Sequence, residues 1–143
     1  MKSLEKSRVE AFIDSNVILR YLAGVEEASK LIKQIDVGFI NPVVVSEVLY
    51  GYIRLASGLR PYELKTQYPK LNINLKPAFE SLSDFILLPL SVELGEVEEF
   101  ASKYKLLPND ALIALTCRHY GIEKIATFDS DFQRVDFLKI LSL

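Results

Sequence analysis

Short apolar segments of strand length alternate with longer helical segments along this chain, and this alternation limits the fold more than any other feature. Apolar side chains at helical spacing fill most of the intervening segments. The predicted strands are residues 9–13, 39–40, 85–88, 124–127 and 137–141, with a loop at residues 128–132 between the last two. Strands that alternate with helices form a mostly parallel sheet with helices on both faces. The sequence therefore predicts an α/β protein.

Proline, glycine and capping residues indicate where the predicted helices begin and end. Pro42 stands where a first helical residue would be, with Asn41 before it as a cap, and Gly58 ends this helix. Pro108 opens a later helix in the same way. The expected helices cover about residues 15–22, 26–35, 42–57, 77–84, 92–104 and 108–120.

Length and composition restrict the class of protein. The 143 residues, half of them hydrophobic, fit one domain of residues 1–143 with a real core. Cys117 is the only cysteine, so no internal disulfide can form and a reducing compartment is expected. No apolar run reaches the roughly 18 residues that span a bilayer, and residues 1–10 lack the apolar core of a signal peptide. We expect a soluble, cytoplasmic protein without a membrane partner.

Charge is uneven along the chain. The net charge of −2 does not indicate nucleic-acid binding, because proteins that bind phosphate backbones are usually basic over one face. Residues 54–76, however, contain five basic residues and one acidic residue, a local charge of +4. Prolines interrupt residues 60–76, for which we expect short helices or a mobile arm. The candidates for phosphate contact are Arg54, Arg60, Lys65 and Lys70, with an ordinary solvated surface as the alternative.

Four acidic residues that are far apart in the sequence are expected at one edge of the sheet. Asp14 and Asp129 follow predicted strands. Asp110 falls in the first turn of the helix that Pro108 opens, and Glu47 lies about one turn into the helix after Asn41. Ligands of open parallel sheets bind beyond the carboxyl ends of the strands. We therefore expect these carboxylates to converge there, with Asp131 close by.

Each acid also has a simpler structural explanation. Asp14 could cap a helix, and Asp110 could interact with a helix dipole. Asp129 and Asp131 could shape a turn. Glu47 is harder to explain in this way, because the residues around it are mostly valine and leucine and a carboxylate among them needs a partner.

Clustered carboxylates indicate a divalent cation. Their mutual repulsion raises pKa values and costs stability, and a cation reverses that cost. A ligand set of carboxylates without histidine or cysteine favours Mg²⁺ or Mn²⁺ over Zn²⁺. Such an ion activates water and offsets phosphate charge, which suits phosphodiester hydrolysis. The only histidine, His119, is two residues from Cys117 and late on its helix, so a nucleophilic Ser–His or Cys–His pair is not expected.

Four motifs together resemble the PIN domain family, particularly its toxins of the virulence-associated protein C (VapC) type. They are FIDSNVI at 12–18, VSEV at 45–48, LPNDALIA at 107–114 and ATFDSDF at 126–132, in the family's order. The resemblance implies a three-layer α/β/α sandwich with a mostly parallel central sheet. It also implies metal-dependent RNA cleavage, a homodimer and inhibition by a small antitoxin.

The resemblance also implies roles for individual residues. The residues at the family's catalytic and metal-binding acidic positions are Asp14, Glu47, Asp110 and Asp129. Asp131 matches a further acid that is sometimes a metal ligand. Asn16 and Thr127 match polar positions beside the metal.

The leading hypothesis is an endoribonuclease toxin that uses Mg²⁺ or Mn²⁺. One alternative is a catalytically silent PIN-like module that binds RNA or protein, although such a module has no need of clustered charge. Another is an RNA-processing nuclease without an antitoxin. A phosphotransfer receiver would require an acidic pair after the first strand, where this chain has Asp14 alone. A flap-type DNA nuclease would require a helical arch, for which the chain is short.

Overall fold

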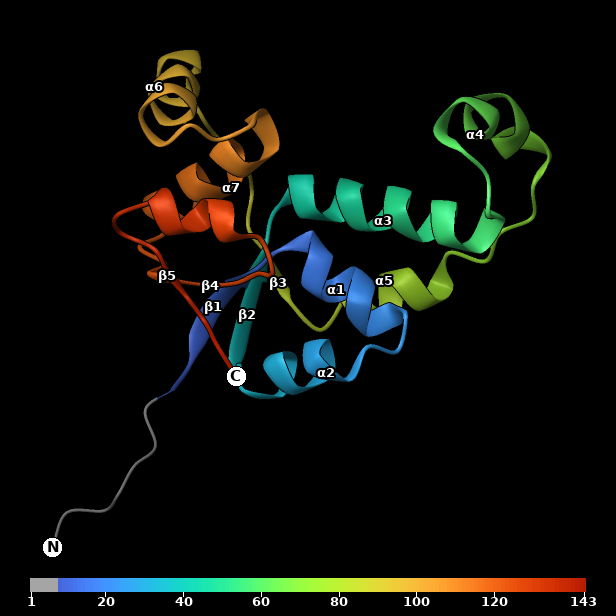
Figure 1. The fold of residues 1–143 in the computed structure, drawn as a ribbon, viewed down its shortest axis with the longest axis horizontal. Coiled ribbons are helices and arrows are strands. Elements are labelled where there is room, and N and C mark those ends of the chain that lie inside the picture. The colour runs from blue at the N-terminus through green and yellow to red at the C-terminus, as the bar shows by residue number, and fades with distance from the viewer. Residues whose placement is uncertain (1–7) are drawn as a thin grey trace, which may run out of the picture.

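The computed structural model describes residues 8–143, in which five strands form one sheet with only parallel pairings (Figure 1). The strands are β1 (Glu10–Ile13), β2 (Val37–Ile40), β3 (Ile86–Leu87), β4 (Lys124–Ala126) and β5 (Lys139–Ile140). Their spatial order is β3-β2-β1-β4-β5. The expected mostly parallel sheet is confirmed. The signal-peptide expectation depends mainly on residues 1–7, which lie outside the described residues.

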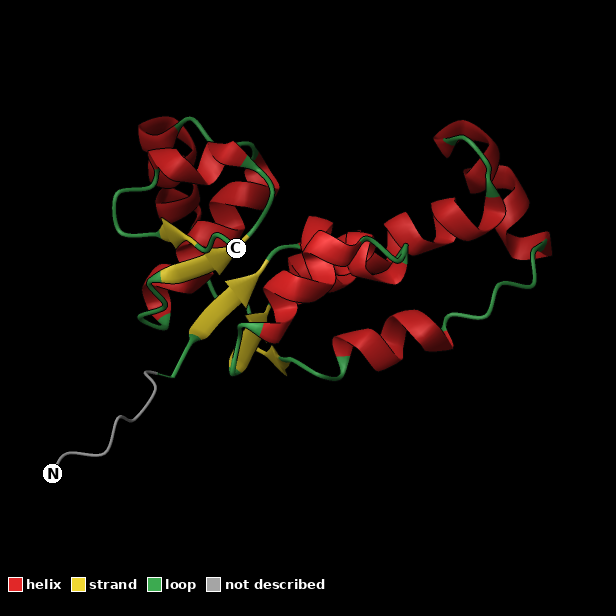
Figure 2. Ribbon diagram, turned by 60° about the horizontal axis from the view of Figure 1, so that its bottom comes forward, coloured by secondary structure: helices red, strands yellow, loops and turns green. Residues whose placement is uncertain are grey.

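Helices cover both faces of the sheet. They are α1 (Ser15–Leu22), α2 (Glu26–Lys33), α3 (Pro42–Ser57), α4 (Pro61–Gln67), α5 (Lys76–Leu82), α6 (Leu94–Tyr104) and α7 (Pro108–His119). Helix α1 packs against α2, α3 and α5, whereas α6 packs against α7. Figure 2 shows the sheet between these two groups, so the three-layer arrangement is confirmed. In the described part of the chain, no helix is both long and apolar enough to cross a membrane.

The core lies between the sheet and the helices. Its largest fully buried side chains come from both, and include Phe12, Ile18, Phe100, Ile113, Ile125 and Phe132. Apolar burial on this scale is the main favourable contribution to folding. The core therefore holds the ends of β1 and β4, and the helices beside them, in a fixed relation.

The strand order reverses between β1 and β4. The chain first adds β2 and β3 on one side of β1 and then crosses to place β4 and β5 on the other side. The backbone N–H of Asp14 donates to the carbonyl of Ala126 at 3.0 Å, which extends the β1–β4 pairing to the ends of both strands. Such a reversal creates a crevice at the carboxyl ends of the strands, where α/β folds bind ligands.

Asn41 joins the two helices that carry Glu47 and Asp110. As predicted, it caps α3: its side chain accepts a hydrogen bond from the N–H of Val44 at 3.1 Å, and Pro42 is the first helical residue. Asn41 is fully buried, and its Nδ2 donates to Thr116 Oγ1 of α7 at 2.9 Å. This link fixes the N-terminal end of α3 against α7.

One segment differs from the prediction, and for a second segment the structure decides between the alternatives that the sequence left open. Residues 128–132 were expected to be a loop, but Ser130–Arg134 forms a 3₁₀ helix, η2, because the Asp129 side chain accepts a hydrogen bond from the N–H of Asp131 at 2.9 Å. Residues 60–76 form short helices, α4 and the 3₁₀ helix η1 (Tyr68–Lys70), which extend beyond the C-terminal end of α3 (Figure 1). Both edge strands, β3 and β5, are shorter than expected.

Candidate active site

Asp14 is the most enclosed of the candidate acids. It follows β1, is 4% exposed, and caps α1 by accepting a hydrogen bond from the N–H of Ser15 at 2.8 Å. Its other oxygen accepts hydrogen bonds from Thr127 Oγ1 at 2.7 Å and from Asn16 Nδ2 at 3.3 Å. Burial raises the pKa of this carboxyl, although the bonds from Thr127 and Ser15 lower it. The predicted cap and the predicted site residue are thus the same side chain.

The carboxylate of Glu47 has hydrogen-bond partners, as expected for an acid whose sequence neighbours are mostly apolar. Ser15 Oγ donates to Glu47 Oε1 at 3.2 Å, and Asn109 Nδ2 donates to Glu47 Oε2 at 3.3 Å. Side chains of α1 and of the first turn of α7 therefore hold the Glu47 carboxylate in place. Neither Ser15 nor Asn109 was among the predicted site residues. Their places in the sequence could have indicated them, because Ser15 directly follows Asp14 and Asn109 directly precedes Asp110.

The remaining three acids form the tightest group. Asp110, Asp129 and Asp131 each offer one carboxylate oxygen such that these atoms lie within 4.8 Å of one another. Asp110 comes from the first turn of α7, Asp129 directly precedes η2, and Asp131 lies within η2. All three side chains are half-buried.

The pKa of Asp110 shows how closely the five acids are coupled. It is raised to about 7, first by burial and then by the negative charges of Asp14, Asp129, Glu47 and Asp131. Every other predicted acid thus acts on this one carboxyl. The structure therefore brings the five predicted acids into one site at the reversal point of the sheet.

Asn16 and Thr127 connect the two strand ends beneath the acids. Asn16 Nδ2 lies 3.4 Å from Thr127 Oγ1, and Asn16 Oδ1 accepts a hydrogen bond from the N–H of Phe128 at 3.2 Å. Thr127 Oγ1 also accepts from the N–H of Asp129 at 3.0 Å. Among the described residues, no buried side-chain nitrogen or oxygen lacks a hydrogen-bond partner. The acids are thus supported by a continuous polar network.

The chemistry of these groups fits a hard divalent cation. The converging donors are carboxylate oxygens, with an amide and a hydroxyl beside them. The histidine and the cysteine play no part here: His119 Nε2 lies 2.8 Å from Glu96 Oε2, and Cys117 is a buried free thiol. The arrangement is suited to binding such a cation and to activating water beside it.

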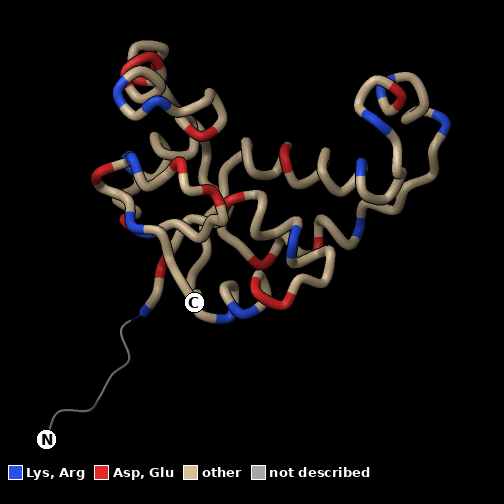
Figure 3. The backbone as a smooth tube through the Cα atoms, viewed as in Figure 1, with Lys and Arg blue, Asp and Glu red and all other residues tan. Residues whose placement is uncertain are grey.

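The predicted basic residues are not part of this cluster. Arg54 lies in the last turn of α3, and Arg60, Lys65 and Lys70 lie at or within α4 and η1, all of them exposed. Figure 3 shows basic residues on this extension, well away from the acids that follow β1 and β4. Arg20 of α1 is closer in structure to the site, because its Cζ lies 4.4 Å from the ring centre of Phe128, the residue before Asp129.

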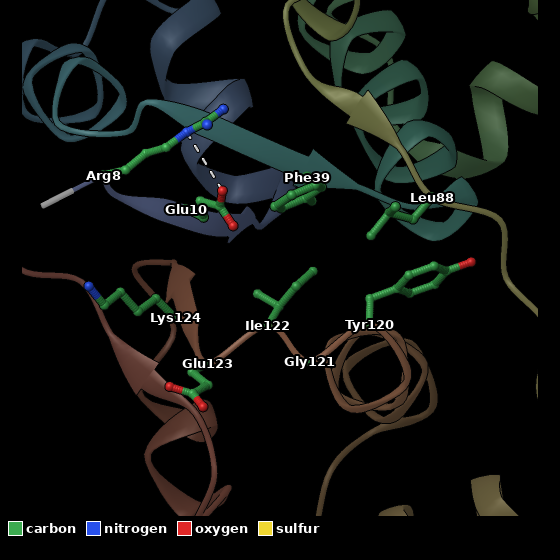
Figure 4. Close-up of a pocket in the computed structure, with 9 residues that line it drawn as sticks. All are labelled: Arg8, Glu10, Phe39, Leu88, Tyr120, Gly121, Ile122, Glu123 and Lys124. Atoms are coloured by element: carbon green, nitrogen blue, oxygen red, sulfur yellow. Dashed lines mark ion pairs between the residues drawn. The ribbon is translucent and has the colours of Figure 1, made fainter.

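A separate hollow of about 350 Å³ lies between the beginnings of β1 and β4 and the C-terminal end of α7 (Figure 4). Glu10 and Lys124, which begin β1 and β4, line it together with Arg8 and Tyr120. Arg8 Nε pairs with Glu10 Oε1 at 3.6 Å. The hollow is lined by both acidic and basic residues, and none of the five candidate acids is among them. We therefore do not assign the predicted metal chemistry to this hollow.

Comparison with known proteins agrees with the geometry. Residues 11–138 match the model of the PIN domain family. Over its full length the chain is 43% identical to "Ribonuclease VapC2" of Methanocaldococcus jannaschii, with complete coverage of both chains. It is also 39% identical to "Ribonuclease VapC6" of the same organism, over 91% of this chain and 95% of that one.

Solved structures share the fold at low sequence identity. PAE2754 from Pyrobaculum aerophilum has a TM-score of 0.62 at 17% identity, with 92% of this chain and 89% of that chain covered. A toxin–antitoxin complex from Klebsiella pneumoniae has a TM-score of 0.59 at 19% identity, with 92% and 96% covered. VapBC2 from Rickettsia felis, bound to promoter DNA, has a TM-score of 0.62 at 17% identity, with 93% and 98% covered.

Proposed function

The chain belongs to the PIN domain family, and from this premise we propose that it is a metal-dependent endoribonuclease that hydrolyses RNA phosphodiester bonds. The observation that carries the proposal is the convergence of five acids at the reversal point of the sheet. Oxygens of Asp110, Asp129 and Asp131 lie within 4.8 Å of one another, and Ser15 and Thr127 link Asp14 to Glu47 and to Asp129. RNA as the substrate is supported by the full-length identity of 43% to a protein named as a ribonuclease. We propose that residues 1–143 act as a single domain.

Asp14, Glu47, Asp110 and Asp129 are the proposed catalytic acids, and these four with Asp131 are the proposed metal ligands. When bound, Mg²⁺ or Mn²⁺ lowers the pKa of water and offsets charge on the phosphate. Thr127 and Asn16 hold the Asp14 carboxylate in place, and Ser15 and Asn109 hold that of Glu47. Hydrogen bonds of this kind orient metal ligands before the metal binds.

The direct test is cleavage of a fluorescent single-stranded RNA by the purified protein. We expect cleavage with Mg²⁺ or Mn²⁺, none with EDTA, and recovery when excess metal is returned. Asp14→Asn should fail to cleave under all these conditions, because it removes a charge from the site. Mn²⁺ binding without cleavage of any of several RNAs would favour the silent binding module. Cleavage that persists in EDTA would contradict a metal-dependent mechanism.

We propose that the protein is the toxin of a toxin–antitoxin pair and that it forms a homodimer. Support for an antitoxin partner comes from the toxin–antitoxin complex that shares the fold. An apolar hollow of about 480 Å³ between α3 and α4, lined by Tyr50, Ile53, Leu64 and Tyr68, offers surface for a small protein. Inhibition of RNA cleavage by a small protein encoded next to this one would support the pairing, and light scattering would give the oligomeric state.

The extension formed by α4 and η1, with its basic residues, is the proposed site of RNA contact away from the acidic cluster. We expect replacement of Arg60, Lys65 and Lys70 by Gln to weaken RNA binding several-fold. It should also reduce the salt dependence of binding, because fewer phosphate charges are neutralised. RNA affinity is measured over a range of salt with the inactive Asp14→Asn protein, and Arg20→Gln serves as the comparison. If only Arg20→Gln lowers RNA affinity, the RNA contact lies beside the acidic site and not on the extension.

A further inference from the structure

Arg134, the last residue of η2, connects one of the acids to the end of a helix in the neighbouring layer. Its Nη1 donates to Asp131 Oδ1 at 3.1 Å. Its Nε donates to the carbonyl of Tyr104 at 2.8 Å, and its Nη2 donates to that of Lys105 at 2.8 Å. Tyr104 ends α6, and Lys105 caps it in the left-handed conformation with φ 55°. One guanidinium thus bonds the carboxylate and two backbone carbonyls.

These contacts fix the direction of the Arg134 side chain. The last carbonyls of a helix lack partners within the helix, and they carry partial negative charge that attracts a cation. A guanidinium presents its donors in one rigid plane, so two bonds to adjacent carbonyls determine where the remaining donors point. One of the remaining donors, on Nη1, points at Asp131.

The short helix that carries both residues is held independently of Arg134. Asp129 caps its beginning through the N–H of Asp131 at 2.9 Å. Phe132 is fully buried in the core, and Val135, the residue after η2, is 1% exposed. Loss of the Arg134 side chain should therefore leave the backbone of η2 in place and release mainly the carboxylate of Asp131.

We propose that Arg134 is a positioning residue for metal binding, which orients the Asp131 carboxylate toward Asp110 and Asp129. The inference rests on the proposed function, because it takes these acids as the metal site. It predicts that the end of α6 helps to determine metal affinity although α6 contributes no acid to the site. A guanidinium that merely caps α6, or one that competes with the metal for Asp131, would behave differently.

Titration of Mn²⁺ into the full chain, followed by calorimetry, tests the inference. Partners that orient metal ligands typically change metal affinity by about 10–100-fold when they are removed. We expect a loss of this order in Arg134→Gln and in Arg134→Lys, because lysine keeps the charge but cannot make the forked contact. The matched control is Arg118→Gln, another exposed arginine of the same layer, whose Cζ lies 5.3 Å from the Phe100 ring centre. It should bind Mn²⁺ like the wild type.

A double-mutant cycle separates positioning from general stability. If Arg134 acts through Asp131, Arg134→Gln should cause little further loss of Mn²⁺ affinity in the Asp131→Asn background. Thermal unfolding in EDTA shows that each variant is folded. Unchanged affinity in folded Arg134 variants, tighter binding, or fully additive losses would each overturn the inference. A wild-type protein that binds no Mn²⁺ would overturn this inference together with the proposed function.

Discussion

Asp110→Asn is expected to lower the rate of RNA cleavage by roughly 10³-fold, equivalent to about 4 kcal/mol of transition-state stabilisation. Asp110 is the acid on which the other four act, and it belongs to the group whose oxygens lie within 4.8 Å. Asparagine has nearly the same shape but lacks the negative charge that holds a cation. The fold should therefore survive while metal binding and cleavage are lost together.

The matched control is Asp84→Asn. Asp84 is exposed, and its side chain makes no hydrogen bond or ion pair with the described residues. Initial rates at saturating and limiting Mn²⁺, together with Mn²⁺ affinity, should change in Asp110→Asn and stay unchanged in Asp84→Asn. Near-normal cleavage by Asp110→Asn would mean that this carboxylate is not needed for the chemistry.

The metal-free protein is expected to lose stability as the pH rises from about 4 to about 7. Asp110 has a pKa of about 7 in the folded protein, against 3.8 when unperturbed. Between these values the folded protein retains a proton that the unfolded chain has released, so raising the pH favours unfolding. The side chain is half-exposed and solvent screens its interactions, so we expect a loss on the order of 2 kcal/mol from this group. For a protein of this size that lowers the melting temperature by roughly 4–8 °C.

The difference between wild type and Asp110→Asn isolates this contribution, because Asp14 shifts the balance in the same direction and Glu96 in the opposite one. In EDTA at pH 8, Asp110→Asn should melt above the wild type, whereas at pH 4 the two should nearly coincide. Added Mg²⁺ or Mn²⁺ should raise the melting temperature of the wild type at pH 8 and have little effect on the variant. Equal wild-type and variant melting curves in EDTA at all pH values would contradict the raised pKa of Asp110.

Local signals in the sequence were sufficient for much of the fold. A helix cap acts over three or four residues, so Asn41, Pro42 and Gly58 identified both ends of α3 correctly. The alternation of strands and helices implied a parallel sheet, and the carboxyl-end rule then placed Asp14 and Asp129 at one edge. The prediction of a loop at residues 128–132 was wrong from Ser130 onward, where the Asp129 cap and the burial of Phe132 together hold a 3₁₀ helix.

The sequence by itself determined the fold class, the order of its elements and the five acids that converge, because these follow from periodicity, local capping and the motifs. Only the tertiary structure decided which side chains hold Glu47 in place and how η2 is tied to α6. Ser15 and Asn109 bond Glu47 from other helices, Arg134 bonds the carbonyls at the end of α6, and no periodicity records such contacts. It also decided that the basic residues near α4 lie apart from the acids, since the direction of α3 depends on how it packs against α1 and α7.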